Sequence, residues 1–370
     1  MADPCLPFPR NPHCVPKLKL DQSNGFPPRW TRRIAYLLVA ALGLALSACG
    51  SGYGGGSEES TLPQPGARQS IEVGGTPVAV AVGAGSVWVV DNSGSRVLEL
   101  DSMNGRPVRK PIPVAAGPEA VAVGEGGIWV TSGDGTVTRI DPGTRQAREA
   151  APQVADPGGI AAGGGSVWVT SRAKGTVTRI DPRTLRAVGD PIAVGAGPTD
   201  VATGAGGAWV ANTEDGTVTR IDESSGQPGG PIQVADYQVL GLCFGENGVW
   251  VAKTDDRLAR TIDVVRIEPS SSQVGDAAAR IPAAIPVRLG ADEGGVWATL
   301  VGGVRPPESK PRPGQVALLD PAGLGSTAQL LRAGDRPAGI AVGEGAAWVA
   351  GSGSGSVTRI AVEPAPGSVE

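Results

Sequence analysis

The sequence has 370 residues and a formal net charge of −4; 40% of the residues are hydrophobic, 18% are charged, and Gly and Pro make up about a quarter. Such a Gly and Pro content approaches that of disordered low-complexity chains. The chain has a single histidine, His13, upstream of a predicted cleavage site. The processed protein would therefore lack the side chain needed for Ser-His-Asp and Cys-His nucleophiles, for histidine general bases and for histidine-ligated metals.

An apolar run near the N-terminus predicts an export signal. The uncharged stretch 34–48 follows arginines at positions 29, 32 and 33, and its 15 residues are too few to span a bilayer comfortably. The stretch closes on residues 46–50 (LSACG), which resemble the bacterial lipobox, where the cysteine becomes the lipidated first residue. We expect residues 1–48 to be the signal region and Cys49 to carry a lipid; a plain signal peptide with a chance cysteine is the alternative.

The segments on either side of this run leave further alternatives open. Thr31-Arg32-Arg33 loosely resembles a twin-arginine export signal, but the residues after it match poorly. The Pro-rich segment 1–28 is unlike the start of a signal peptide, and a translation start further downstream, for example at Val15, would explain it. Residues 49–69 are rich in Gly, Ser and Pro without a periodic apolar pattern, which predicts a flexible tether.

Cysteine content and charge limit the class of the mature protein. Cys243 is the only cysteine beyond the tether, so we predict no disulfide framework and interpret Cys243 as a small buried apolar side chain. Removing residues 1–48 takes away six basic and two acidic residues, and the net charge becomes −8. An acidic protein does not suggest a nucleic-acid partner.

Tryptophan spacing indicates a repeat. Seven of the eight Trp residues recur at intervals of 41, 39, 41, 41, 47 and 51 residues, and a period near 40 is typical of a repeat fold with one shared architecture. Within one repeat, short β-branched or alternating runs at 117–124, 127–131 and 135–142 are bounded by turn residues and predict strands, which we name A, B and C; a fourth strand, D, completes the repeat. The repeated tryptophans are Trp88, Trp129, Trp168, Trp209, Trp250, Trp297 and Trp348.

The ends of the repeat array complement each other. The last repeat has runs for strands A, B and C but none for D, whereas residues 70–74 precede the first strand A and match the D pattern. The N-terminal strand can complete the last sheet, which closes a ring and hides its edges. We predict an all-β fold: a seven-bladed β-propeller of four-stranded antiparallel blades over residues 70–363, followed by a disordered tail at 364–370.

The repeated phrase carries a family resemblance. The resemblance is carried by Trp-Val-Thr followed by Gly-Thr-Val-Thr-Arg-Ile-Asp-Pro, with Gly-Pro before strand A. The repeat resembles the YVTN-type and virginiamycin B lyase-like propellers of bacterial envelopes. The likeness covers the whole predicted propeller. The resemblance to the lyase-like proteins implies an elimination reaction that opens a cyclic depsipeptide. It also implies a histidine base and a metal ion at the central face of the propeller. This sequence departs there, because no histidine follows His13.

The repeated residues themselves are given packing roles. We interpret the blade tryptophans as fillers of the wedge between neighbouring sheets rather than as sugar-stacking platforms. Strand C carries arginines at equivalent positions, each followed in several blades by an aspartate two residues later, and we interpret them as structural pairs between blades. These residues are Arg139, Arg179, Arg220, Arg266 and Arg359, with Asp141, Asp181 and Asp222.

Candidate binding residues lie where the repeat breaks. We count residues from the Trp of strand B to the apolar residue of strand C that precedes its acidic residue. This separation is 11 or 12 residues in five blades, but 17 in the fifth blade and 22 in the sixth. Both insertions fall in B–C loops, which share one end of the ring with the D–A loops. The basic residues of this sector, near Tyr237 in a D–A loop, are Lys253, Arg257, Arg260, Arg288, Arg305, Lys310 and Arg312.

This basic sector predicts a recognition patch for an anionic or carboxylate-bearing partner, because arginine offers bidentate contacts; drifted, solvated loops are the alternative. Four residues of other D–A loops are expected to ring the mouth of the central channel on the same face. They are Glu119, Asp156, Asp200 and Arg336.

Two classes of function follow. The favoured one is a monomeric, lipid-anchored scaffold at the bacterial cell envelope, without a cofactor, that presents this loop face to a protein, peptidoglycan or glycan partner. The alternative is a lyase-like or lactonase-like metal-dependent enzyme, in which Glu119, Asp156, Asp200 and Asn212 would supply oxygen ligands, although their spacing does not demand it. A purely structural or sensory ectodomain is a third possibility.

Overall fold

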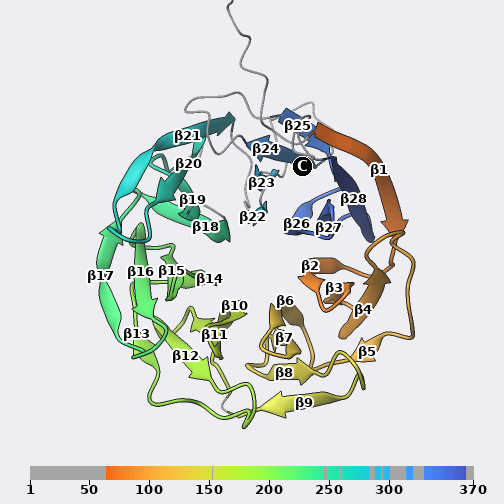
Figure 1. Cartoon of the computed structure of the whole chain (residues 1–370), viewed down its shortest axis with the longest axis horizontal. Helices are drawn as coiled ribbons and strands as arrows, with labels where there is room; N and C mark the ends of the chain where they lie inside the picture. The colour runs from red at the N-terminus through yellow and green to blue at the C-terminus, as the bar shows by residue number, and fades with distance from the viewer. Residues whose placement is uncertain are drawn as a thin grey trace, which may run out of the picture. The chain divides into compact units, whose positions relative to one another are not determined.

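The computed structural model describes residues 64–151, 153–245, 248–257, 261–282, 288–292, 295–300, 314–319 and 329–363. These residues form seven four-stranded antiparallel sheets arranged in a ring (Figure 1), which confirms the predicted seven-bladed β-propeller. None of the described residues belongs to a helix with the length and apolar character needed to span a bilayer. The predictions for the signal region, for Cys49 and for the tail at 364–370 concern residues outside these ranges.

Strand A is the innermost strand of each blade and faces the centre of the ring (Figure 1). In several blades it carries a β-bulge near its first residue, as at Glu119, which is the extra residue between the paired positions Pro118 and Ala120. A bulge changes the direction in which the local side chains point. The bulges of strand A lie at its first residues, at the D–A end of the channel. The seven A strands are β2 (Pro77–Gly83), β6 (Pro118–Gly124), β10 (Pro157–Gly163), β14 (Pro198–Gly204), β18 (Gln238–Gly245), β22 (Leu289–Asp292) and β26 (Pro337–Gly343).

Strand B is the most buried strand, and it holds the repeated tryptophans. Each of these rings is at most 3% exposed, and each packs against the following blade: Trp129 clusters with Val167 and Val169, and Trp348 of the last blade clusters with Leu100 of the first. The interpretation of the tryptophans as inter-blade wedges is confirmed. The B strands are β3 (Ser86–Asp91), β7 (Gly127–Ser132), β11 (Ser166–Ser171), β15 (Gly207–Asn212), β19 (Gly248–Thr254), β23 (Gly295–Leu300) and β27 (Ala346–Gly351).

Strand C pairs with strand B so that its arginine lies opposite the tryptophan, as Arg139 lies opposite Trp129. In four blades the guanidinium stacks over the indole of its own blade, at 5.2 Å for Arg179 over Trp168 and 5.9 Å for Arg139 over Trp129. The C strands are β4 (Arg96–Asp101), β8 (Val137–Ile140), β12 (Thr176–Ile180), β16 (Thr217–Asp222), β20 (Thr261–Ile267), β24 (Gln315–Leu319) and β28 (Ser356–Glu363).

The predicted pairing of these arginines with aspartates is not between blades: the pair seen among the described residues, Arg139 Nη2 to Asp141 Oδ2 at 3.9 Å, lies within the second blade. The aspartates at the end of strand C instead hold the C–D turn: the Asp141 carboxylate accepts hydrogen bonds from the backbone N–H of Gly143 (3.1 Å) and Thr144 (2.8 Å). These bonds lower the pKa of Asp141, chiefly through Thr144. Short Asx turns of this kind explain why an acidic residue recurs there.

Strand D is the outermost strand, and the N-terminal strand supplies it for the last blade. There β1 pairs with β28, from Gln64 opposite Glu363 to Glu72 opposite Ser356, which confirms the predicted ring closure. The strand begins at Gln64, earlier than the predicted boundary at residue 70, because four of the six residues 64–69 that were assigned to the tether also pair with β28. The D strands are β1 (Gln64–Glu72), β5 (Ile112–Pro113), β9 (Ala147–Ala150), β13 (Ile192–Ala193), β17 (Pro228–Gln233), β21 (Val274–Pro282) and β25 (Gln329–Arg332).

A buried carboxylate organises the first B–C loop. The side chain of Asp91 is fully buried and accepts hydrogen bonds from the N–H of Thr76 (2.8 Å), the N–H of Gly94 (3.2 Å) and Nε of Arg96 (2.8 Å). Burial by itself raises the pKa of Asp91, but the bonds from Thr76, Arg96, Ser93 and Gly94 outweigh it and lower the pKa. The ionised form of Asp91 therefore stabilises the loop.

Candidate binding site at the mouth of the central channel

The A strands enclose a central channel with a cavity of about 630 Å³. Val, Ala, Gly, Ile and Leu side chains make up most of its wall, as the repeated Val-Ala-Val pattern of strand A requires. Because strand A is the inner edge of each blade, backbone groups line the cavity together with these residues, and a concave site with a few convergent charged groups is a usual form of a ligand site. Its charged lining residues are Glu119, Arg172, Asp200 and Arg288.

One charged group at the mouth is an arginine held by two carboxylates. Arg172 follows β11 in the B–C loop of the third blade; its Nη2 lies 2.6 Å from Oδ1 of Asp156 and 3.2 Å from Oε2 of Glu119, and its Nε donates to Asp156 at 3.0 Å. The hydrogen bond that Arg172 donates to Asp156 is the main reason that the pKa of Arg172 is raised. Arg172 thus joins the second and third blades through these two carboxylates at the channel mouth.

The second group is Asp200, which lies on β14 and bridges to the fifth blade. Its Oδ1 accepts from the N–H of Val201 (3.0 Å) and its Oδ2 from the N–H of Leu242 (3.3 Å) on β18. Burial against the channel wall raises the pKa of Asp200, while the positive charge of Arg288, which precedes β22, acts in the opposite direction. Asp200 and Arg288 thus place opposite charges on the channel wall, which also carries Glu119 and Arg172.

Cys243 lies beside this pair and is buried, as predicted. Burial, and to a lesser extent the charge of Asp200, raises the pKa of the thiol well above its usual range. A buried thiol that stays protonated is a poor nucleophile and metal ligand. Cys243 therefore serves packing at the wall rather than chemistry.

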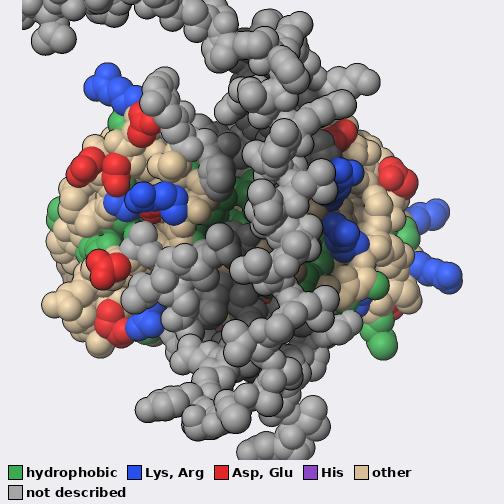
Figure 2. Space-filling view, turned by 90° about the horizontal axis from the view of Figure 1, so that it is seen from above, with side chains coloured by type: hydrophobic (Ala, Val, Ile, Leu, Met, Phe, Trp, Pro, Cys, Tyr) green, Lys and Arg blue, Asp and Glu red, His purple; other side chains and the backbone are tan. Residues whose placement is uncertain are grey.

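The predicted basic sector is only partly described. Lys253 forms an ion pair with Asp255 at 2.7 Å, so its charge is neutralised locally. Arg257 is exposed, and Arg288 faces the channel beside Asp200. Figure 2 shows acidic and basic side chains interspersed on the visible surface of the described residues. The remaining basic residues of the prediction lie outside the described residues: Arg260, Arg305, Lys310 and Arg312.

Two other predicted residues lie at the same end of the ring. Tyr237 is half-buried in the D–A loop between β17 and β18. Arg336 is exposed just before β26, and its backbone carbonyl accepts hydrogen bonds from the N–H and hydroxyl of Ser352, each at 3.0 Å. Both positions stay candidates for contact with a partner.

The oxygen ligands considered for an enzyme do not come together. Glu119 and Asp156 are both bound by Arg172. Asn212 is fully buried inside the fourth blade, where its amide donates to the hydroxyls of Thr217 (3.0 Å) and Thr219 (2.9 Å). Within the described ranges, no three His, Cys, Asp or Glu side chains form a group that could hold a metal ion.

Sequence reasoning named Glu119, Asp156, Asp200 and Arg288 but missed Arg172, which links two of them. The residue after strand B differs from blade to blade, as Asn92, Gly133, Arg172 and Thr213 in the first four, so only its charge distinguished Arg172 in the sequence.

Comparison with solved structures identifies proteins of similar shape. Virginiamycin B lyase from Staphylococcus aureus matches with a TM-score of 0.63 and 16% identity over 80% of this chain and 99% of that chain. A streptogramin B lyase matches with a TM-score of 0.62 and 16% identity over 83% and 100%. Hydrazine synthase from Kuenenia stuttgartiensis matches with a TM-score of 0.63 and 16% identity over 85% and 100%.

These likenesses establish the fold. The resemblance to virginiamycin B lyase, expected from the repeat phrase, is confirmed at the level of architecture. No protein-family model and no curated protein matches the sequence. Since identities near 16% reflect a shared propeller and not a shared reaction, the function has to be argued from the site.

Proposed function

We propose that the protein is an exported binding module, tethered to the membrane through a lipid on Cys49, that engages a partner at the bacterial cell envelope with the D–A/B–C face around the channel mouth. The observation that carries the proposal is the placement of opposite charges, Asp200 and Arg288, on a channel wall lined mainly by Val, Ala, Gly, Ile and Leu. Charged groups on such a wall are costly to hold there and are usually retained for recognition or chemistry.

Topology supports the choice of face. β28 runs from the B–C loop to the opposite end of the blade, and Gln64 of β1 pairs with Glu363 at that opposite end. A tether from Cys49 therefore reaches the propeller on its A–B/C–D face. Residues 50–63 can extend at most about 50 Å. The chain thus enters the propeller at the end of the ring opposite the channel mouth, which leaves the mouth available to a partner.

A lyase-like activity is not proposed. One of the similar structures is described as a catalytically inactive histidine-to-alanine variant of virginiamycin B lyase with quinupristin. This chain places its one histidine, His13, before the predicted cleavage site, so the propeller has no histidine for such a role. The mouth offers opposite charges held in place, which suits binding better than proton transfer.

Affinity capture from envelope extract tests the proposal. Wild type is compared with Asp200→Asn, which removes a charge without changing shape, and with Arg288→Ala; Arg148→Ala, an exposed position on β9 at the rim, is the matched control. We expect the two mouth variants to lose the captured partner by about tenfold and the rim variant to retain it. Equal capture by all four folded proteins would refute a role for the channel mouth.

A further inference from the structure

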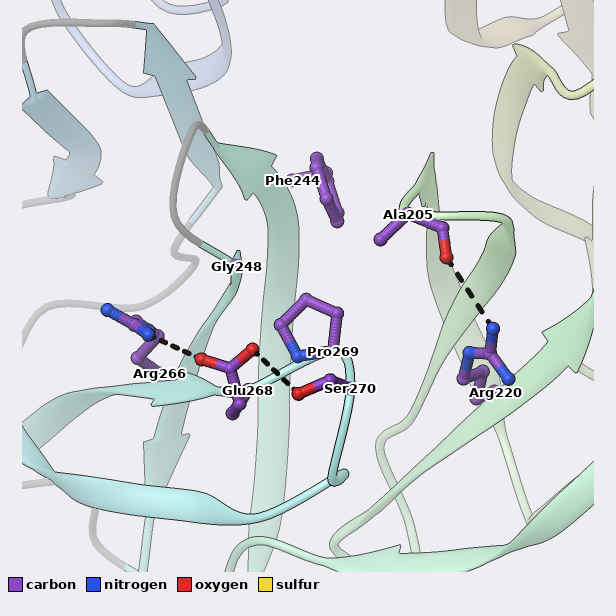
Figure 3. Close-up of a pocket in the computed structure, with 8 residues that line it drawn as sticks. All are labelled: Ala205, Arg220, Phe244, Gly248, Arg266, Glu268, Pro269 and Ser270. Carbon is purple, nitrogen blue, oxygen red and sulfur yellow. Dashed lines mark hydrogen bonds and ion pairs between the residues drawn. The ribbon is translucent and has the colours of Figure 1, made fainter.

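A second cavity of about 590 Å³ opens on the A–B/C–D side, between the fourth and fifth blades (Figure 3). It does not depend on the channel-mouth proposal. The fourth blade contributes a residue of its A–B turn and one of β16, while the fifth blade contributes β18, β19, β20 and the turn after it. The lining residues are Ala205, Arg220, Phe244, Gly248, Arg266, Glu268, Pro269 and Ser270.

The residues at this junction leave space between the blades. Between the third and fourth blades, Glu223 follows β16 and its carboxyl group lies where a Cβ of Gly164 would be, so that side chain fills the gap. One blade further on, the corresponding residues are Ala205 and Pro269, and Pro269 has no long side chain to reach across. Ala84 and Pro142 hold the same positions between the first and second blades, so this pair permits the space but is not particular to it.

Phe244 gives the cavity an apolar wall. It occupies the position before the last residue of strand A, where the fourth blade has Thr203, and a Cβ on Gly204 would overlap its ring. The ring is half-buried, leaving part of it exposed to the cavity. In Figure 3, Phe244 and Pro269 lie between Arg220 on one side and the Arg266–Glu268 pair on the other.

The guanidinium groups of the two arginines differ in how many of their hydrogen bonds and ion pairs are made within the protein. Arg266 is neutralised by Glu268 at 2.6 Å, and the Glu268 carboxylate also accepts from the hydroxyl of Ser270 at 3.3 Å. Arg220 stacks over Trp209 at 5.6 Å, and Nη2 reaches the carbonyl oxygens of Ala205 and Gly206 only at 3.5 Å. No carboxylate among the described residues forms an ion pair with Arg220.

Two of the equivalent arginines make shorter hydrogen bonds than Arg220 does. Arg139 donates to the carbonyl of Gly126 at 2.7 Å, and Arg179 donates to the hydroxyl of Ser166 at 2.8 Å. Arg220 is thus held in place by its stack while its hydrogen-bonding capacity is left largely unused. A planar guanidinium in this state suits bidentate binding of a carboxylate.

We propose that this cavity binds a small aromatic carboxylate, with the carboxylate on Arg220 and the aromatic body against Phe244 and Pro269. The charge of the lining favours this ligand, because Arg266 and Glu268 cancel and Arg220 leaves one positive charge. The volume accommodates a phenyl ring with a short acidic chain, since ligand sites of this kind begin at about 300 Å³.

Titration of the purified propeller by NMR or calorimetry tests this site with phenylacetate. Acetate keeps the charge and lacks the ring, and 2-phenylethanol keeps the ring and lacks the charge. We expect phenylacetate to bind about tenfold more tightly than either probe. Equal binding of phenylacetate and 2-phenylethanol, or no saturable binding of phenylacetate, would overturn the proposal.

A matched pair of variants assigns the binding to this cavity. Arg220→Ala removes the proposed carboxylate partner, and Arg139→Ala removes the same stack in the second blade, over Trp129, away from the cavity. We expect the Arg220 variant to bind phenylacetate about tenfold more weakly and the Arg139 variant to bind it as the wild type does. Equal weakening in both would mean that the effect is on blade stability, and the site would be rejected.

Discussion

The N-terminal strand closes the ring, and Ile71 is its main apolar contact. Ile71 is 8% exposed and packs in the cluster that joins the last blade to the first, together with Leu100 and Trp348. Ile71→Ala removes three carbon atoms, which at about 0.8 kcal/mol each gives about 2.4 kcal/mol. The cavity left behind adds to this, so we expect a loss of about 2–4 kcal/mol in the free energy of unfolding.

Urea unfolding followed by tryptophan fluorescence measures the loss, because the blade tryptophans become exposed when the ring unfolds. Ser70→Ala is the control, since Ser70 is exposed and neighbours Ile71 on the same paired strand; its effect should stay within about 0.5 kcal/mol. If Ile71→Ala is as stable as Ser70→Ala, β1 does not hold the first and last blades together and the reasoning on ring closure fails.

Four further predictions follow from other parts of the chain. Because its folded-state pKa is lowered, Asp91 contributes stability above the ordinary pKa near 4. Urea titrations should show that Asp91→Asn costs about 1–3 kcal/mol at pH 7 and that the deficit shrinks at pH 3; a deficit independent of pH would contradict this. Asp200 has a raised pKa, so its ionisation costs stability as the pH rises above about 4. The free energy of unfolding of the wild type, relative to that of Asp200→Asn, should therefore fall between pH 3 and pH 7 in urea titrations; a relative stability that does not change or that rises with pH would count against it. Gly204→Val should cost at least about 1–3 kcal/mol in urea unfolding, because its Cβ would overlap the Phe244 ring; wild-type stability would show that the ring moves freely. Cys49→Ala should release the protein from membranes on cell fractionation, and unchanged membrane association would refute the lipid anchor.

Most of the fold could be predicted from the sequence because the propeller repeats. The tryptophan period gave the number of blades, and the missing fourth strand of the last repeat pointed to β1 as its replacement. The start of β1 was misplaced because Gln64–Gln69 has the composition of a linker, while its pairing along β28 is a long-range contact. Local composition cannot reveal a partner strand almost 300 residues away.

The site was predictable in its location but not in its pairings. The D–A loops were expected to ring the channel mouth, and Glu119 and Asp200 do line it. Which charges neutralise one another depends on side chains from different blades, as with Arg172 between the second and third. The same limit explains the missed cavity at Arg220, because its stack on Trp209 is a repeat feature whereas its unfilled neighbourhood depends on Pro269 of the next blade.

Photo-crosslinking in intact cells tests the account most directly. A photoreactive residue replaces Arg257 or Arg336 on the D–A/B–C face, or the exposed Ala84 or Glu344 in A–B turns on the opposite face. The account predicts a discrete crosslinked partner from Arg257 and Arg336 and none from the A–B turns. A partner captured only from Ala84 and Glu344, or equally from both faces, would contradict the claim that the channel-mouth face is the one that binds.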